Sequence, residues 1–257
     1  MEVILTESQI KEFVIIEGVK NVLEESVLLN ESLDVIKSQI RNAIIAGIAC
    51  TSIIAGIATS KYFDNAQKRE LINYVEQNDV YSTTQKELHD EKVKALERCM
   101  RDKYLKLKGP KSYNPKDILL SAEEMVSACE EHDYDLVLAA AQAWYESAWG
   151  TTPRAKKTNS VFSVGSYDNG KNTAIYNDVN ASIRPYIKLM KNDYNIDTNT
   201  INSIFSGKQS LVNHDGNRYA SNKAYEKNLA ATYYSILKSY PVLSWDVETY
   251  LKNKEGI

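Results

Sequence analysis

The sequence predicts a mainly α protein with a small β lobe, and three observations support this fold class. The first hundred residues contain no proline and only three glycines, while all five prolines lie at Pro110 or later. Apolar side chains also recur at helical spacing from Ile15 to Ile57. The signal for β structure is confined to 165–176, where an Asp-Asn-Gly turn lies between short strand-like pieces and predicts a small hairpin.

The N-terminal pattern follows alternate steps of four and three residues over about six heptads, with Ser26 as its one polar member. Charged residues fill the other faces between Glu24 and Arg41. We expect either a coiled coil, which would make the protein a homo-oligomer, or a helical hairpin within one chain. The positions are Ile15, Val19, Val22, Ser26, Leu29, Leu33, Ile36, Ile40, Ala43, Gly47, Cys50, Ile54 and Ile57.

The segment 43–59, AIIAGIACTSIIAGIAT, carries no charge on any face. Its length is at the lower limit of about 17 residues for a membrane span. Its many small residues make it only weakly hydrophobic, although they suit close helix packing. The sequence leaves two expectations open: a membrane anchor, or a helix buried in a core or oligomer. The N-terminus itself lacks the basic and apolar regions of a secretory signal.

A domain boundary is expected in KGPKSYNPKD, residues 108–117, which combines a glycine with two prolines. It separates a helical stalk or anchor region, 1–108, from a second domain, 109–257. In the second domain Ser121 and Glu124 form a capping box for a helix that reaches about His132. Further helices are expected over 134–149, 180–194, 201–205 and 223–240.

The composition excludes several classes of function. The formal net charge of −3 gives no sign of nucleic-acid binding. The three cysteines and three histidines are scattered and none has ligand spacing, so we expect no metal and no cofactor. The 17 tyrosines are the unusual count, and tyrosine suits carbohydrate or interface contacts because it joins a flat apolar face to a polar tip.

Glu146 is the candidate catalytic residue. It lies in the last turn of an alanine-rich helix, next to Trp144, Tyr145 and Trp149 and before Gly150. The negative end of the helix dipole and desolvation by the aromatic rings would both raise its pKa. A carboxylic acid that stays protonated near neutral pH is what glycoside cleavage needs in order to protonate the leaving oxygen. The alternative is an exposed glutamate above two core tryptophans.

The stretch AQAWYESAWGTTPRAKKTNSVFSVG resembles the glucosaminidase family of bacterial and phage cell-wall hydrolases, glycoside hydrolase family 73, and its Bax-like branch. That motif reads roughly A-Q-A-x-x-E-S-x-W-G-x-S, followed by N-N-L-F-G. Two later segments, 177–194 and 217–229, are similar to later blocks of the family, so the resemblance covers about 120–240. The matching motif residues are Gln142, Glu146, Ser147, Trp149, Gly150, Thr152, Asn159, Val161 and Phe162.

The resemblance implies a lysozyme-like α domain that hydrolyses β-1,4 glycan strands of peptidoglycan, as an N-acetylglucosaminidase or a muramidase. It implies that Glu146 is the general acid and that Tyr219 and Asp168 are further catalytic residues. The residues expected to bind the glycan are Trp144, Tyr145, Trp149, Asn159, Phe162 and Tyr225.

The chain departs from this family pattern in the loop after Glu146. Ser160 replaces the second asparagine and Ser163 replaces the glycine, although Gly165 follows. No glutamate lies between Glu146 and Glu226. Some members of the family are thought to use an acidic residue of the β lobe as second carboxylate, and in that region only Asp168 and Asp178 are available. An inverting enzyme would hold such a base about 6.5–9.5 Å from the acid, whereas a retaining route can use the acetamido group of the substrate.

Two functional hypotheses follow from these residues. The first is a peptidoglycan hydrolase located in the cell envelope, anchored through 43–59, or carried in a phage virion. The second is a structural or virion protein that retains an inactive lysozyme-like domain for glycan binding. An open cleft around Glu146 would favour the enzyme.

Overall fold

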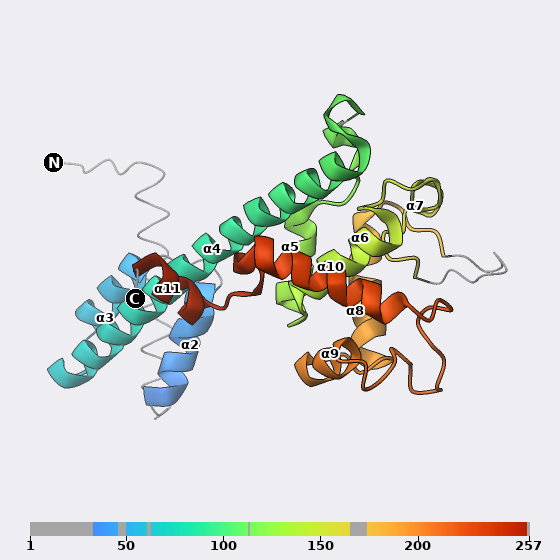
Figure 1. The fold of residues 1–257 in the computed structure, drawn as a ribbon. Coiled ribbons are helices and arrows are strands. Elements are labelled where there is room, and N and C mark those ends of the chain that lie inside the picture. Colours follow the sequence, from blue (N-terminus) through green and yellow to red (C-terminus); the bar gives the residue numbers. More distant parts are fainter. Residues whose placement is uncertain (1–32, 46–49, 61–62, 113, 165–173, 256–257) are drawn as a thin grey trace. The chain divides into compact units, whose positions relative to one another are not determined.

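The computed structural model describes residues 33–45, 50–60, 63–112, 114–164 and 174–255. These residues are almost entirely helical (Figure 1). They form two compact units, 1–87 and 88–257, and each is considered by itself. The mainly α class expected from the sequence is confirmed.

Unit 1 contains helices α2 (Leu33–Ile45) and α3 (Cys50–Thr59) and the first part of α4 (Asn65–Lys108). Its core consists mainly of isoleucine side chains, and the heptad positions Ile36, Ile40 and Ile57 are at most 2% exposed. A hydrogen-bonded ion pair of 2.6 Å between Lys37 and Glu70 links α2 to α4. In the described residues the heptad pattern therefore packs helices of one chain together, as in the helical hairpin. The part of the pattern before Leu33 lies outside the described residues.

The apolar segment 43–59 runs from the end of α2 through α3, and its residues 46–49 lie outside the described part. Ile53 and Ile57 are both 0% exposed within the core of unit 1. Among the helices that the structure describes, none combines the length and the apolar character needed to cross a bilayer.

Unit 2 is a layered bundle built around one buried helix, α6 (Leu136–Ser147). Every residue of α6 from Leu136 to Ala143 is buried, and its run of alanines lets α5 and α10 pack closely on it. The remaining elements of the unit are η1 (Pro110–Ser112), η2 (Pro115–Asp117), α5 (Ala122–Glu131), α7 (Pro153–Thr158), η3 (Asn180–Ser182), α8 (Ile183–Asn192), α9 (Thr198–Phe205), α10 (Tyr225–Ser239), η4 (Pro241–Ser244) and α11 (Val247–Glu255).

Helix α4 begins in unit 1, and its last part, from Leu88 to Lys108, belongs to unit 2. Its residues Ala95, Leu96 and Cys99 are at most 1% exposed in the core of unit 2. The compact units thus divide inside α4, between Glu87 and Leu88, whereas the sequence placed the domain boundary at 108/109. The sequence assigned 61–108 to a helical stalk, and the structure places the apolar side chains of its last part in the core of unit 2.

The helix ends of unit 2 agree well with the sequence signals. The Ser121 side chain accepts a hydrogen bond from the Glu124 amide, which is the predicted N-cap, and α5 ends at its C-cap His132. Asp135 caps α6 and Asp197 caps α9 in the same way. These caps fix where α6 begins and therefore where its last turn presents Glu146.

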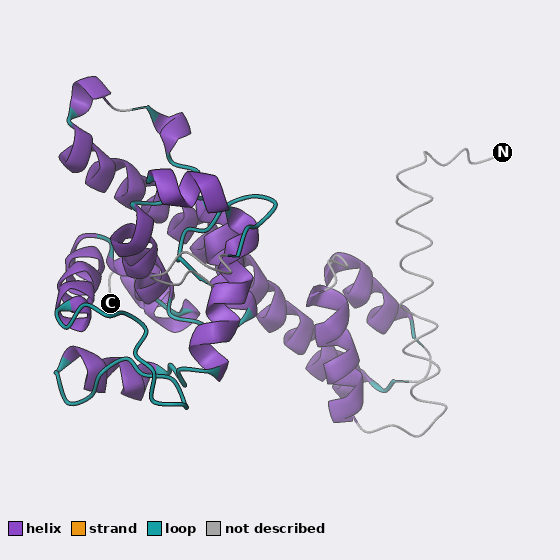
Figure 2. Cartoon of the chain, turned by 90° about the vertical axis from the view of Figure 1, so that its right-hand side faces the viewer, coloured by secondary structure: helices purple, strands orange, loops and turns teal. Residues whose placement is uncertain are grey.

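No strand is found among the described residues, and Figure 2 shows only helices and loops there. The one β feature in this part of the chain is an isolated antiparallel bridge between Val212 and Arg218. The expected β lobe is therefore not seen. The predicted hairpin over 165–176 falls mainly on 165–173, outside the described residues.

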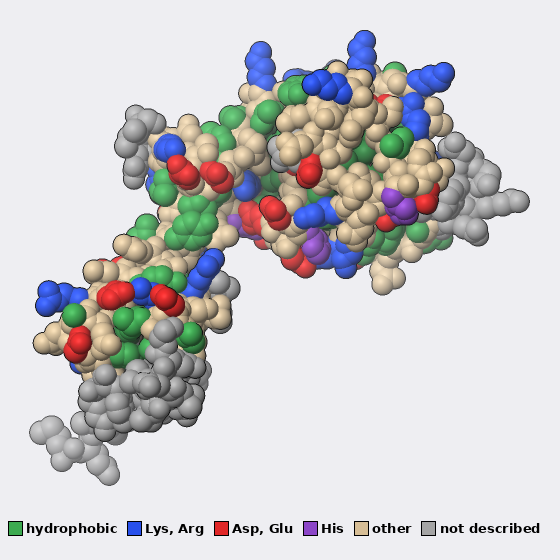
Figure 3. Space-filling view, turned by 90° about the horizontal axis from the view of Figure 1, so that it is seen from below, with side chains coloured by type: hydrophobic (Ala, Val, Ile, Leu, Met, Phe, Trp, Pro, Cys, Tyr) green, Lys and Arg blue, Asp and Glu red, His purple; other side chains and the backbone are tan. Residues whose placement is uncertain are grey.

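The face drawn in Figure 3 carries acidic and basic side chains intermixed over both units, in keeping with the small net charge. Within unit 2, a cluster of charged side chains joins α4 to α5. His89 contacts Glu130 through Nδ1 at 2.7 Å and Glu123 through Nε2 at 3.0 Å. Burial acts to lower the pKa of His89, but the two carboxylates outweigh it and raise that pKa above its usual value.

We expect unit 2 to lose stability as the pH rises through the folded-state pKa of His89. A raised folded pKa means that the contribution is complete below the unfolded value of about 6.5 and disappears above the folded value. His89→Gln should destabilise the protein by about 1–2 kcal/mol at pH 6 and by much less at pH 9. Urea unfolding of the wild type and the variant at pH 6 and pH 9 measures the two losses of unfolding free energy. Equal losses at the two pH values would contradict a stabilising charge on His89.

Candidate active site

The last turn of α6 ends in an unusual left-handed reversal. Ala148, Trp149 and Gly150 have φ values of 47°, 63° and 84° in succession. Gly150 suits this position because a residue with a Cβ would be strained at its φ of 84°. Space does not decide the matter, since an added Cβ would make only ordinary contacts of 3.4–3.7 Å with the side chains of Leu119, Val179 and Val161. The Trp149 amide returns to the Ala143 carbonyl at 3.2 Å, so the chain folds back under the helix.

This reversal carries Trp149 into the core, where it is 0% exposed. Trp144 lies beside it at a ring distance of 5.5 Å, half-buried, with Lys103 Nζ 5.7 Å from its own ring centre. Neither ring lines the cleft next to Glu146. The sequence placed both tryptophans at the glycan, but Trp144 precedes Glu146 by two residues, which is about 200° around a helix.

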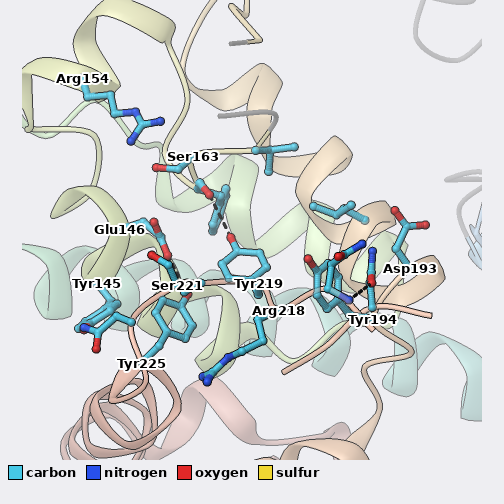
Figure 4. A pocket seen from close by; sticks show the side chains of 17 residues that line it. Tyr145, Glu146, Arg154, Ser163, Asp193, Tyr194, Arg218, Tyr219, Ser221 and Tyr225 are labelled. Carbon is cyan, nitrogen blue, oxygen red and sulfur yellow. Dashed lines mark hydrogen bonds between the residues drawn. The ribbon is translucent and has the colours of Figure 1, made fainter. Parts of the chain in front are cut away.

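An open cleft of about 850 Å³ lies next to the end of α6 (Figure 4). Its walls come from α6, the start of α7, the loop 162–164, the end of α8 and the loop 213–222. The lining residues are Tyr145, Glu146, Arg154, Phe162, Ser163, Val164, Leu189, Asp193, Tyr194, Asn213, Asn217, Arg218, Tyr219, Ala220, Ser221, Asn222 and Tyr225.

The carboxyl group of Glu146 is half-buried at one end of this cleft. Burial raises its pKa above the usual value, against hydrogen bonds from Tyr225 and Ser163 and the positive charge of Arg154, which all act to lower it. Because burial is the largest of these effects, Glu146 holds its proton to a higher pH than an exposed glutamate. The Glu146 side chain is turned toward the cleft (Figure 4), so a carboxyl group with a raised pKa faces this space.

Two tyrosines from the C-terminal part of unit 2 converge on Glu146. The Tyr225 hydroxyl donates a hydrogen bond of 2.8 Å to Glu146 Oε1. The Tyr219 hydroxyl donates one of 3.0 Å to the carbonyl oxygen of Phe162. Both tyrosines line the cleft, as does Tyr145, whose hydroxyl accepts from Asn228 at 3.1 Å. Tyr225, expected only to bind glycan, is the one that contacts the carboxyl group.

Phe162 and Asn159 shape the loop that faces Glu146. Phe162 is 0% exposed and stacks on Tyr186 with ring centres 3.7 Å apart. Asn159, in a left-handed conformation at φ 50°, donates to the carbonyls of Tyr176 at 2.9 Å and Asn177 at 3.3 Å. Phe162 lines the cleft, whereas Asn159 is outside its lining and holds the loop to the following segment.

Ser163 occupies the position at which the glucosaminidase motif has glycine, and it adopts a left-handed conformation with φ 55°. Its side chain favours the carboxylate form of Glu146 and so acts to lower the pKa of that group. The neighbouring departure, Ser160, is buried, and its hydroxyl has no hydrogen-bond partner among the described residues. The loop thus keeps at Ser163 a backbone conformation that favours glycine. The serine adds a hydroxyl group that acts on the Glu146 carboxyl.

Replacing Ser163 separates these two effects. Ser163→Ala and Ser163→Gly should both raise the pKa of Glu146, because each removes a hydroxyl that favours the carboxylate. Only glycine relieves the left-handed backbone, so the glycine variant should be more stable than the alanine variant by about 1 kcal/mol. Thermal unfolding and a pH titration of the Glu146 carboxyl check both parts. Equal stability of the two variants would mean that the left-handed backbone at position 163 is not strained.

The candidates for a second carboxylate are separated by the structure. Asp168 lies outside the described residues. Asp178 Oδ1 accepts from the amides of Asn180 at 2.7 Å and Ala181 at 3.1 Å, which is a capping role. Asp193, which the sequence did not single out, is the acidic residue besides Glu146 among the described lining residues. It lies at the far end of the cleft from Glu146 (Figure 4).

Other lining residues were also missed from the sequence, among them Arg154, Tyr194 and Arg218. Arg218 pairs with Glu226 at 2.7 Å, and Glu226 Oε1 also accepts from the Leu211 amide at 3.1 Å, so this pair closes the loop 211–226. These residues are brought together by loop packing and no motif spacing marks them. Among the described residues no group of His, Cys, Asp and Glu side chains is arranged to hold a metal.

Comparison with known protein families adds one match. Residues 122–238 match the family Glucosaminidase, described as mannosyl-glycoprotein endo-beta-N-acetylglucosaminidase. The matched segment runs from the first residue of α5 to the last turn of α10, so it contains Glu146 and the tyrosines around it. A comparison with curated proteins found no match.

Proposed function

We propose, from the premise that residues 122–238 form a glucosaminidase-family domain, that the protein cleaves β-1,4 glycan strands of peptidoglycan with Glu146 as general acid. The family supports a peptidoglycan-degrading glycosidase in general. The finer proposal rests on one observation: a half-buried carboxyl group with a raised pKa opens onto a cleft with aromatic walls.

The residues that line the cleft suit the chemistry of a glycan strand. Tyr145, Tyr194 and Tyr219 offer ring faces that can pack on sugar rings. Asn213, Asn217 and Asn222 add amide groups that can hydrogen-bond to sugar hydroxyls and acetamido groups. A cleft of this kind favours an enzyme over the alternative, a virion or structural protein with an inactive glycan-binding domain.

In the first step, protonated Glu146 gives its proton to the glycosidic oxygen as the bond from that oxygen to the anomeric carbon breaks. The bonding electron pair stays on the leaving oxygen, and the sugar passes through an oxocarbenium-like transition state. Glu146 becomes a carboxylate, which the Tyr225 hydroxyl and the Ser163 side chain stabilise by hydrogen bonds. Water then completes hydrolysis, assisted by a second carboxylate or by the substrate's acetamido group.

Such a substrate lies outside the cytoplasmic membrane. We therefore propose that the protein acts in the cell envelope or is carried in a phage virion. The helices of unit 1 would then serve for anchoring or assembly.

The test is to incubate the purified full-length chain with peptidoglycan and to analyse the released fragments by chromatography and mass spectrometry after borohydride reduction. Reduced N-acetylglucosamine at the new ends would identify a glucosaminidase, and reduced N-acetylmuramic acid a muramidase. Glu146→Gln is the matched control and should release either product about 10²–10⁴-fold more slowly. If the wild-type chain were shown by circular dichroism to be folded and still released no fragments, the enzyme hypothesis would be rejected. The alternative, an inactive glycan-binding domain, would then be favoured.

A further inference from the structure

A chain of hydrogen-bonded side chains runs beneath Glu146 through the otherwise apolar core of unit 2. Gln142 lies one helical turn before Glu146 on α6 and is 0% exposed. Its Nε2 donates to the Tyr225 hydroxyl at 3.2 Å, and its Oε1 accepts from the Tyr186 hydroxyl. The Tyr186 hydroxyl in turn pairs with that of Tyr134 at 2.9 Å.

The single proton of each hydroxyl gives this chain a direction. Tyr225 donates its proton to Glu146 Oε1, so it receives the bond from Gln142 on a lone pair. Tyr186 donates its proton to Gln142. The Tyr134 hydroxyl must then donate to Tyr186. Every donor in the chain points from Tyr134 toward Glu146.

The reverse direction is also a closed chain, and it would have a different chemical outcome. With the Gln142 amide turned by 180°, Tyr225 would donate to Gln142, and Glu146 could bond to Tyr225 only by giving its own proton to the tyrosine oxygen. The acid proton would then point into the core and away from the cleft. The orientation of one buried amide thus decides where the proton of Glu146 is held.

The core selects the first direction. In the reverse chain Tyr186 would donate to Tyr134, whose own O–H would then need an acceptor. The described residues provide no hydrogen-bond partner for the Tyr134 hydroxyl other than Tyr186. A buried O–H donor without an acceptor is unfavourable, so Tyr186 directs its proton to Gln142. The stacking of Tyr186 on Phe162 at 3.7 Å fixes the ring that carries this hydroxyl.

We propose that Gln142 and Tyr186 are positioning residues that aim the Tyr225 hydroxyl at Glu146 Oε1 and thereby keep the acid proton of Glu146 on Oε2, available to the glycosidic oxygen. This inference rests on the proposed function of Glu146. When the proton leaves Oε2 and the glycosidic bond breaks, the Tyr225 O–H already points at the carboxylate that forms. No group has to turn during the step, which is the advantage of a preorganised donor.

The proposal makes Tyr186→Phe and Tyr134→Phe a matched pair, since both remove one hydroxyl from a core tyrosine. Without the Tyr186 hydroxyl nothing selects the orientation of the Gln142 amide, and Tyr225 no longer donates steadily to Glu146. Without the Tyr134 hydroxyl, Tyr186 still donates to Gln142. The other groups that face Glu146 are Ser163, Arg154 and Tyr219, and both variants leave them in place.

The first measurement is the pKa of Glu146 in the full-length chain, by carbon-13 NMR of labelled glutamate carboxyls, with the signal assigned through Glu146→Gln. Tyr186→Phe should raise this pKa because a donor that favours the carboxylate is lost, whereas Tyr134→Phe should leave it unchanged. An unchanged pKa in Tyr186→Phe, or an equal rise in both variants, would overturn the proposal. This readout needs no turnover, so it separates failure of the proposal from failure of the proposed function.

The second measurement is the rate of peptidoglycan cleavage. Tyr186→Phe should lower kcat about tenfold and change KM little, because the acid is misdirected while the cleft wall is intact. The alkaline limb of its pH profile should move to higher pH with the pKa. A change in KM alone would overturn the positioning role. If Tyr186→Phe fails to fold, Gln142→Met removes the amide that links Tyr186 to Tyr225 and carries the same expected outcomes.

Discussion

Glu146→Gln is expected to lower the rate of glycan cleavage by about 10²–10⁴-fold, the range typical for loss of a general acid. Glutamine has nearly the same shape and can accept the 2.8 Å hydrogen bond from Tyr225, but it has no proton to give to the leaving oxygen. Reducing ends released from peptidoglycan measure the rate. The profile of the wild type against pH should fall on the alkaline side as Glu146 loses its proton at a raised pKa.

The same substitution should raise stability at neutral pH. Because the folded pKa of Glu146 is raised above its unfolded value, its contribution to stability is complete below the unfolded pKa and declines as pH rises through the folded pKa. A neutral glutamine avoids this loss, so the melting temperature of the variant should exceed that of the wild type at pH 7 and match it near pH 4. Slower cleavage together with a lower melting temperature at pH 7 would indicate a damaged fold and not a missing acid.

Trp149→Ala is expected to destabilise unit 2 by about 3–5 kcal/mol, the usual loss when a large aromatic side chain is removed from a core. Trp149 is fully buried, and its backbone carbonyl also accepts from the amides of Leu119 at 3.3 Å and Leu120 at 3.4 Å. Denaturant unfolding measures the loss. Trp144→Ala is the control, and since Trp144 is only half-buried its loss should be clearly smaller.

The kinetic behaviour of Trp149→Ala distinguishes the core from the cleft. Under conditions where the variant remains folded, its KM for glycan should stay close to that of the wild type. A stable Trp149→Ala protein with a greatly raised KM would mean that the ring contacts sugar, as the motif alone suggested.

The local signals in the sequence were reliable where a short stretch of chain decides the structure. The cap at Ser121 follows from its sequence signal. The helices expected over 134–149 and 223–240 correspond to α6 (Leu136–Ser147) and α10 (Tyr225–Ser239). Glu146 was found because its helix position and aromatic neighbours lie within a few residues. The heptad pattern was found for the same reason, although it could not distinguish a coiled coil from helices packed within one chain.

What the sequence could not give depends on backbone reversals and on contacts between distant segments. Trp149 lies in the core because of a left-handed turn at three successive residues, which no apolar pattern marks. The polar chain joins Gln142 to residues 44 and 83 positions later in the sequence. Arg154 and Asp193 enter the cleft only through the way the loops pack.

The hydroxyl of Ser163 makes the proton affinity of Glu146 depend on the shape of a loop. Linkage between two equilibria is reciprocal, so any event that moves 162–164 away from Glu146 strengthens the hold on the proton, and loss of the proton draws the loop inward. A sugar that displaces this hydroxyl on entering the cleft would therefore raise the pKa of Glu146 and favour its protonated form just before the proton is transferred. The serine at position 163, which departs from the glycine of the motif, would in this way couple substrate binding to the pKa of Glu146.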